Sequence, residues 1–154
     1  MKEIKLTQGF VTKVDDEDYE WLNRWRWKPQ IDHNNVYAVR NIRYNGGYKT
    51  IRMHRFIVNP PDGILIDHID SDGLNNQKYN LRLCNECQNR AHRKPNKNHK
   101  YIGVGVYKNI FRARIRFNNI IYALGYFKTE KEAAIAYNIA ALRLKGNFAY
   151  LNVI

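Results

Sequence analysis

The chain has 154 residues, which is enough for one domain or two small ones and excludes a large multidomain enzyme. Hydrophobic residues make up 44% of it, so we expect a folded core. Lysine and arginine total 26 against 14 acids, giving a net charge of +12, which indicates an acidic polymer as partner. No apolar run approaches the ~20 residues of a membrane span, and the N-terminus lacks the apolar region of a signal peptide. We therefore expect a soluble cytoplasmic protein without a membrane segment.

The two signs of charge are segregated along the chain. Seven of the 14 acids lie within residues 1–32, whereas residues 73–120 carry eleven lysines and arginines and one acid, Glu86. A surface charged for solubility alone would mix both signs. We therefore expect residues 73–120 to form the main contact with the partner.

Residues 1–58 alternate in polarity over short runs, which predicts strands around one short helix. The aspartates before this helix are suited to cap it, and it ends by Trp25. Strands at 35–44 and 48–53 then flank a Gly-rich turn as a hairpin.

The middle of the chain, residues 62–93, predicts a strand, a polar loop, a second strand and a helix. The strands fall at 64–69 and 81–84. Asn85 is suited to cap the following helix, with Gln88 at its third position.

Residues 94–100 are basic and contain no apolar side chain except proline, which predicts a linker between a domain over 1–93 and another over 101–154. The second domain predicts three strands and then a helix that begins at a capping box and has an Ala-rich apolar face. We therefore expect an α+β fold that ends in a three-stranded antiparallel sheet packed on one α-helix. The predicted strands are 101–107, 111–117 and 120–127.

Four polar residues of the middle segment form a candidate catalytic set. Asp67 and His68 end the first strand, Asn80 ends the loop, and Asn89 lies in the first turn of the helix. Carboxylate and amide oxygens suit a hard cation such as Mg²⁺, and an imidazole can take a proton from water near neutral pH. Together these groups suit the hydrolysis of a phosphodiester.

The segment ILIDHIDSDGLNNQKYNLRLCNECQNRAHR closely resembles the HNH nuclease motif of phage and group I intron homing endonucleases, and MHRFIV extends the resemblance upstream. The resemblance implies a ββα-metal core at about 62–93 and an origin in a bacterial or phage-infected cell. It implies Asp67 and Asn89 as metal ligands and His68 as the general base. Asn80 would tie the loop to the strand by backbone hydrogen bonds. The N-terminal part resembles leader segments of similar phage proteins.

Other metal-ligating residue types nearby have more ordinary interpretations. We expect His54 to be structural, whereas His92, on the same helical face as Asn89, is a candidate contact to the metal or a phosphate. Cys84 and Cys87 form half of a zinc site. Without a second such pair we expect no zinc, and we interpret Cys84 as part of the core.

The strand predicted at 111–117 alternates cationic and apolar side chains. Arg112, Arg114 and Arg116 point to one face, and the apolar residues between them point to the other. If the apolar face meets the helix, three guanidinium groups line an open sheet. Such a surface can contact phosphates or guanine edges of duplex DNA.

Residues 101–153 are similar, almost end to end, to the DNA-binding domain of plant ethylene-response factors. YIGV, LGYFKTEKEAAIAYNIAA and GNFAYLN carry the match. Gly105 and Tyr107 stand where the plant domains have base-reading arginines, and Ala123 replaces an aromatic residue, so the plant target sequence does not carry over. The expected DNA contacts are Arg112, Arg114, Arg116, Tyr107, Lys108 and Tyr122.

We therefore predict a divalent-metal-dependent DNA endonuclease of HNH homing type. With one active site it would nick one strand of duplex DNA at sites chosen by its C-terminal domain. The alternative is a DNA-binding regulator on an HNH scaffold that does not cut. A third class, an RNA-binding protein, is less favoured because the arginine-lined sheet lacks an exposed aromatic pair for stacking. No protein partner is implied, and monomer and dimer both remain open.

Overall fold

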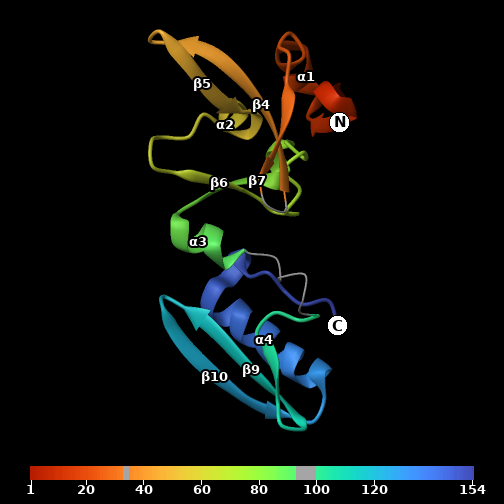
Figure 1. The fold of residues 1–154 in the computed structure, drawn as a ribbon, viewed down its shortest axis with the longest axis vertical. Helices are drawn as coiled ribbons and strands as arrows, with labels where there is room; N and C mark the ends of the chain where they lie inside the picture. The colour runs from red at the N-terminus through yellow and green to blue at the C-terminus, as the bar shows by residue number, and fades with distance from the viewer. Residues whose placement is uncertain (33–34, 93–99) are drawn as a thin grey trace. The chain divides into compact units, whose positions relative to one another are not determined.

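The computed structural model describes residues 1–32, 35–92 and 100–154 (Figure 1). The chain forms two compact units, Met1–Asn85 and Glu86–Ile154. Both units combine helices and strands, in agreement with the predicted α+β class. None of the described helices combines enough length with enough apolar character to cross a membrane.

The first unit begins with a small antiparallel hairpin. β1 (Lys2–Lys5) pairs with β2 (Val11–Val14), and the short helix η1 (Thr7–Gly9) connects them. α1 (Asp16–Leu22) begins two residues after β2. The predicted short helix is thus present, and it ends three residues before Trp25.

A three-stranded antiparallel sheet with the order β3-β4-β5 follows. The predicted hairpin is its β4–β5 pair, and the turn residues Asn45 and Gly46 both have positive φ, as a two-residue type I′ turn requires. The strand β3 was not predicted, because its sequence has little alternation in polarity. The strands are β3 (Lys28–Asp32), β4 (Asn35–Tyr44) and β5 (Gly47–Arg52).

The helix α2 (Met53–Val58) begins where a strand was predicted to end. Met53 is fully buried, and Phe56 and Ile57 pack against the same core. This core also holds Trp27, which is 1% exposed. The remaining buried members of the core are Ile4, Leu6, Val14, Leu22 and Ala38.

Two short strands close the first unit. β6 (Leu65–His68) pairs antiparallel with β7 (Leu81–Cys84), and a twelve-residue polar loop lies between them, ending in η2 (Lys78–Asn80). Both strands were predicted, at nearly these bounds.

In the second unit a three-stranded antiparallel sheet, with β9 in the centre, packs against α4 (Figure 1). Ile115 of β9 meets Tyr137 and Ala141 of α4 in the core. The predicted capping box holds the start of α4 through Thr129 and Glu132. The elements are β8 (Val104–Tyr107), β9 (Ile110–Phe117), β10 (Ile120–Phe127), α4 (Glu130–Lys145) and η3 (Gly146–Phe148).

The helix α3 (Glu86–Ala91) groups with the second unit, although the sequence analysis placed it in the first domain. It contacts η3, Lys145 Nζ lies 3.5 Å from the carbonyl oxygen of Ala91, and the rings of His92 and Tyr150 lie 5.9 Å apart. The order strand, strand, helix is present along the chain. The predicted linker lies, except for Lys100, outside the described residues, and the predicted domain bounds stay a prediction.

Two glycines of the second unit provide a matched test of this packing. A Cβ on Gly103, whose φ is +74°, would collide with the ring of Tyr137, whereas a Cβ on Gly105 would meet open space. We expect Gly103→Ala to lower the free energy of unfolding by at least ~2 kcal/mol, through backbone strain and overpacking. Gly105→Ala should change it by less than about 0.5 kcal/mol. Denaturant unfolding followed by far-UV circular dichroism measures both, and equal effects would contradict the packing of Gly103 on Tyr137.

Candidate active site and nucleic-acid surface

The β6–β7 pair places the first two candidate residues. Asp67 lies opposite Arg82 and His68 lies opposite Leu81. His68 is 4% exposed, and Asp67 is 9% exposed. Because successive strand residues point to opposite faces, Asp67 and His68 project from opposite sides of β6.

Asn80 holds the long loop against the end of β6. Its carbonyl oxygen accepts the N–H of Ile69, and its side-chain oxygen accepts the N–H of Asp70 at 3.0 Å. Its side-chain amide donates to the carbonyl oxygen of Asn75 and to the Asp70 carboxylate. Asn80 is 2% exposed, so these bonds satisfy a buried amide as well as fixing the loop.

Asp70 is the acceptor on which the loop is organised. Burial alone would raise the pKa of this carboxyl, but hydrogen bonds from the Asp72 N–H and from the amides of Asn75 and Asn80 outweigh it and hold the pKa below its ordinary value. The bond from Asn75 is 2.6 Å long. Asp70 was not among the predicted site residues; its place two residues after His68 was the available signal.

A buried chain of hydrogen bonds fixes the His68 ring. The Thr12 hydroxyl donates to the carbonyl oxygen of Leu74 at 2.7 Å, and the side-chain amide of Asn76 donates to the Thr12 hydroxyl at 2.8 Å. The remaining side-chain oxygen of Asn76 lies 3.3 Å from Nε2 of His68. Thr12, Asn76 and His68 are all less than 5% exposed.

The hydrogen bonds of this series all run in one direction. The Leu74 carbonyl can only accept, so the Thr12 hydroxyl gives its proton there and accepts from the Asn76 amide. The Asn76 oxygen then faces His68, whose Nε2 must carry the proton. The other ring nitrogen, Nδ1, is left as the basic atom.

A second histidine packs against this ring. His54 of α2 contacts His68 edge to face, with ring centroids 5.0 Å apart, and Tyr37 lies near both rings. Burial, with smaller effects of His68, Arg52 and Arg55, lowers the pKa of His54 to about 3. Its neutral ring is part of the packing around His68, as the structural interpretation of His54 expects.

Burial also lowers the pKa of His68. A hydrogen bond with Asn76 and the carboxylates of Asp70, Asp67 and Asp72 oppose this shift. His68 is therefore neutral near pH 7 and can accept a proton there.

Asp67 is tied to an arginine that the sequence analysis did not select. Arg82 donates from Nε at 2.9 Å and from its terminal nitrogen at 2.6 Å to the same carboxylate oxygen. The register of β6 and β7 places the two residues directly opposite each other. Arg82 thus orients the Asp67 carboxylate on the strand.

The described residues contain no group of three or more His, Cys, Asp or Glu that could hold a metal ion. The candidate donors are instead the Asp67 carboxylate and the amide of Asn89, which is exposed on α3 in the second unit. These are hard oxygen ligands and fit Mg²⁺, which keeps water or phosphate oxygens in its other positions. Asp67, Asn89 and His92 as metal contacts therefore stay a prediction.

The two cysteines are both free, and they lie in different units. Cys84, at the end of β7, is buried, as its interpretation as core expects, and Cys87 is exposed on α3. Burial raises the pKa of the Cys84 thiol, with the Asp67 carboxylate adding to the effect. A buried, protonated thiol is a poor metal ligand.

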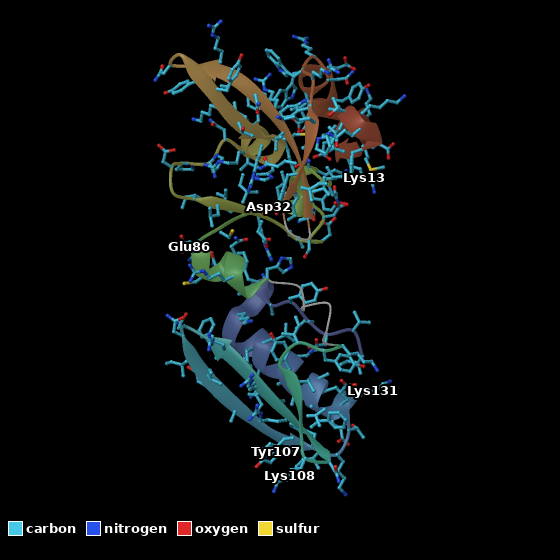
Figure 2. All side chains as sticks on the ribbon, viewed as in Figure 1. Lys13, Asp32, Glu86, Tyr107, Lys108 and Lys131 are labelled. Carbon is cyan, nitrogen blue, oxygen red and sulfur yellow. The ribbon has the colours of Figure 1, made fainter. Side chains whose placement is uncertain are left out.

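In the second unit the predicted arginine row is present on β9. Ala113 and Ile115 are buried under α4, and Arg112, Arg114 and Arg116 alternate with them toward the open face of the sheet. Tyr107 shares that face, because β8 pairs Tyr107 with Ile110 and Gly105 with Arg112. Figure 2 shows Tyr107 and Lys108 at the β8–β9 turn.

A bulge in β10 changes which tyrosine joins the arginines. Leu124 is an extra residue between Ala123 and Gly125, so Tyr126 pairs with Arg112 and shares its face. Tyr122 instead pairs with the buried Ile115 and lies on the α4 side. The contact of Tyr122 with DNA stays a prediction, and Tyr122 lies on the face of the sheet opposite to the arginines.

The expectation that this sheet lacks an exposed aromatic pair is wrong. The rings of Tyr107 and Tyr126 lie 5.3 Å apart, and these residues are 44% and 57% exposed. Tyr122 rather than Tyr126 was predicted as the DNA contact, because the bulge that puts the two tyrosines on opposite faces was not predicted. Gly125, with φ of +125°, was the available signal for the bulge.

The two buried histidines generate a prediction on pH and stability. Each has a folded pKa below its unfolded value near 6.5, so below that pH the unfolded chain binds protons that the folded chain does not. Stability is therefore complete above pH 6.5 and falls toward pH 4.5, by up to about 1.4 kcal/mol per pH unit from His54, with His68 acting in the same direction. Asp70 adds nothing in this window, because its contribution is lost only below its ordinary value of 3.8.

All three tryptophans lie in the first unit, so their fluorescence during urea unfolding reports on it selectively. His54→Gln should reduce the slope of the free energy of unfolding against pH by about 1.4 kcal/mol per pH unit, which is the contribution of one proton. A wild-type free energy of unfolding that stays level from pH 6.5 to 4.5 would contradict the buried, neutral histidine pair.

The chain is similar to a protein of Acanthamoeba polyphaga mimivirus that is named an uncharacterized HNH endonuclease, with 34% identity over 110 residues. The match covers 68% of this chain and 58% of the relative, so the chain spans little more than half the length of the curated relative it matches. No protein-family model and no solved structure matches the chain. The name of the relative supports the HNH nuclease resemblance found in the sequence.

Proposed function

We propose that this chain is a DNA endonuclease of HNH homing type that hydrolyses one phosphodiester bond per event and so nicks duplex DNA. One observation carries the proposal: His68 is held in a single tautomer, beside Asp67, at the end of a strand whose following loop Asn80 ties down. The name of the mimivirus relative supports the same class of activity.

The hydrogen bonds around His68 support a proton transfer at one ring atom. His68 Nδ1 takes a proton from water, and the resulting hydroxide forms the new bond to phosphorus while the bond from phosphorus to the sugar oxygen breaks. The Asn76 oxygen accepts from Nε2–H and stabilises the imidazolium that forms. Asp67 and Asn89 would hold a Mg²⁺ ion, which would neutralise charge on the phosphate and the leaving oxygen.

The proposed role of the second unit is to select and hold DNA. The arginine row lines an open sheet face, and α4 covers the other face. A two- or three-stranded sheet fits the major groove of duplex DNA. The similarity to plant ethylene-response factor domains supports this assignment.

The exposed tyrosine pair favours a second candidate function, binding of single-stranded nucleic acid. Tyr107 and Tyr126 lie beside Arg112, and aromatic rings next to cations stack unpaired bases. Competition between duplex DNA and single-stranded DNA or RNA of equal length distinguishes the two. Preference for duplex DNA supports the endonuclease proposal.

Nicking of supercoiled plasmid in Mg²⁺ tests the chemistry. His68→Ala should lower the single-turnover rate by ~10² to 10⁴-fold, the usual contribution of a general base, with DNA affinity in Ca²⁺ unchanged. Asn76→Ala should lower the rate less, because it removes only the partner that orients the ring. No nicked circle with any divalent metal would overturn the endonuclease proposal, and tight binding without cleavage would favour a non-cutting regulator.

Removal of the arginine row tests the binding surface. The triple change of Arg112, Arg114 and Arg116 to Ala should weaken duplex binding and reduce the slope of log affinity against log salt by about 3. The control removes the same charge elsewhere: Lys128, Lys131 and Arg143 to Ala, of which the last two lie on α4, which covers the opposite face of the sheet. Gel shifts across a salt series measure both, and equal losses would contradict a specific role for the row.

A further inference from the structure

The second unit contains a cavity of about 490 Å³, and two of its lining residues, Arg114 and Arg116, also belong to the arginine row. Its walls come from α3, from the residues just before β8, from β9 and the turn after it, from β10 and from α4. This volume lies within the range of small-molecule sites, ~300 to 1,000 Å³. The residues that give it chemical character are Arg90, Arg114, Arg116, Phe117, Tyr137 and Lys145.

The charge of these walls is of one sign. Of its four cationic lining residues, Arg114 and Arg116 direct their side chains to the open face of the sheet, and the lining residues include no carboxylate. Arg90, at the exposed rim, is bonded to Glu86 of its own helix. Within the described part of the chain, Lys145 has no acidic partner: its ammonium lies near two neutral oxygens, the Ala91 carbonyl at 3.5 Å and the Tyr137 hydroxyl at 3.4 Å.

Lys145 is cationic and partly buried, and burial lowers its pKa from the ordinary value. Its place at the C-terminal end of α4 favours a positive charge, yet this does not offset the loss of water. An anion beside the ammonium would remove the free-energy cost of burying its charge, because paired buried charges are far less costly than single ones.

The edge of β9 adds backbone groups to the same wall. β8 begins at Val104, opposite Ala113, so the end of β9 has no strand beside it on that side. The N–H of Arg114 points there, to the Gly103 carbonyl at 2.8 Å. Since backbone direction alternates along a strand, the N–H of Arg116 points to the same side, toward the cavity.

We propose that this cavity binds a phosphate group, held by Lys145 and the Arg116 N–H. Phe117 and Ile121 provide an apolar wall on which a base or sugar attached to that phosphate can rest. The phosphate can come from a free nucleotide or from the backbone of DNA. The inference does not depend on cleavage by the first unit.

The test uses the full chain in EDTA, so that cleavage plays no part. Amide chemical shifts are followed by NMR during titration with thymidine 5′-monophosphate, with inorganic phosphate, and with thymidine. We expect saturable shifts at Gly103, Arg116 and Asn118 with both phosphates and none with thymidine. Equal binding of thymidine, or no saturable shift with either phosphate, overturns the proposal.

Lys145→Gln should weaken thymidine monophosphate about tenfold, the loss expected for one charge-assisted hydrogen bond. Lys145→Arg should retain binding. Lys131→Gln, which changes an exposed lysine near the start of the same helix (Figure 2), should alter affinity less than about twofold. Equal effects of the changes at Lys145 and Lys131 overturn the proposal.

A measurement on the unmodified chain covers the case in which Lys145→Gln fails to fold. Phosphate should raise the pH at which the ε-methylene signal of Lys145 titrates, and an unchanged titration overturns the proposal.

Addition of a 20-base-pair duplex to the nucleotide complex distinguishes the two sources of the phosphate. Displacement of the nucleotide assigns the cavity to a DNA phosphate, and simultaneous binding assigns it to a free nucleotide.

Discussion

The buried hydrogen-bond chain from Leu74 through Thr12 and Asn76 to His68 is the constraint on which the candidate active site depends. It joins residues 64 positions apart in the sequence, because Asn76 donates to Thr12 of β2. Lys13 and Asn75 form a parallel bridge beside it, and the Asp15 carboxylate accepts the N–H of Lys78 at 2.7 Å. The loop that precedes β7 is therefore fastened at several points to the N-terminal hairpin.

The acids near the N-terminus have a structural use within this arrangement. Lys78 binds Glu17 and Asp18 of α1, and Asp15 also accepts from the Gln77 amide. From the sequence, the acidic run was notable only as a contrast to the basic segment that follows. In the fold it fixes the far end of the loop.

Much of the fold could be predicted because local signals coincide with the final structure. The Asn-Gly turn, the capping box of α4 and the alternation of β9 each act within a few residues. α2 could not be predicted, because its six residues become helical through the contacts of Met53 and Phe56 with a distant core. The bulge in β10 was missed for a similar reason, since one extra residue reverses every later side chain in the strand.

The residues of the candidate site could be predicted, but their hydrogen-bond and ion-pair partners could not. The motif spacing located Asp67, His68 and Asn80. Their partners Arg82 and Asn76 depend on strand register and on loop conformation, which the spacing does not encode. Thr12 lies too far away in the sequence for any local pattern to reveal it.

The attachment of Thr12 also bears on how such a protein can be recombined with others. The N-terminal part resembles leader segments of similar phage proteins, yet β2 supplies the hydroxyl group that orients Asn76 and, through it, the His68 ring. A graft of residues 62–93 onto another scaffold would carry every motif residue and lose this partner. A transferable version of this candidate site therefore has to include the N-terminal hairpin.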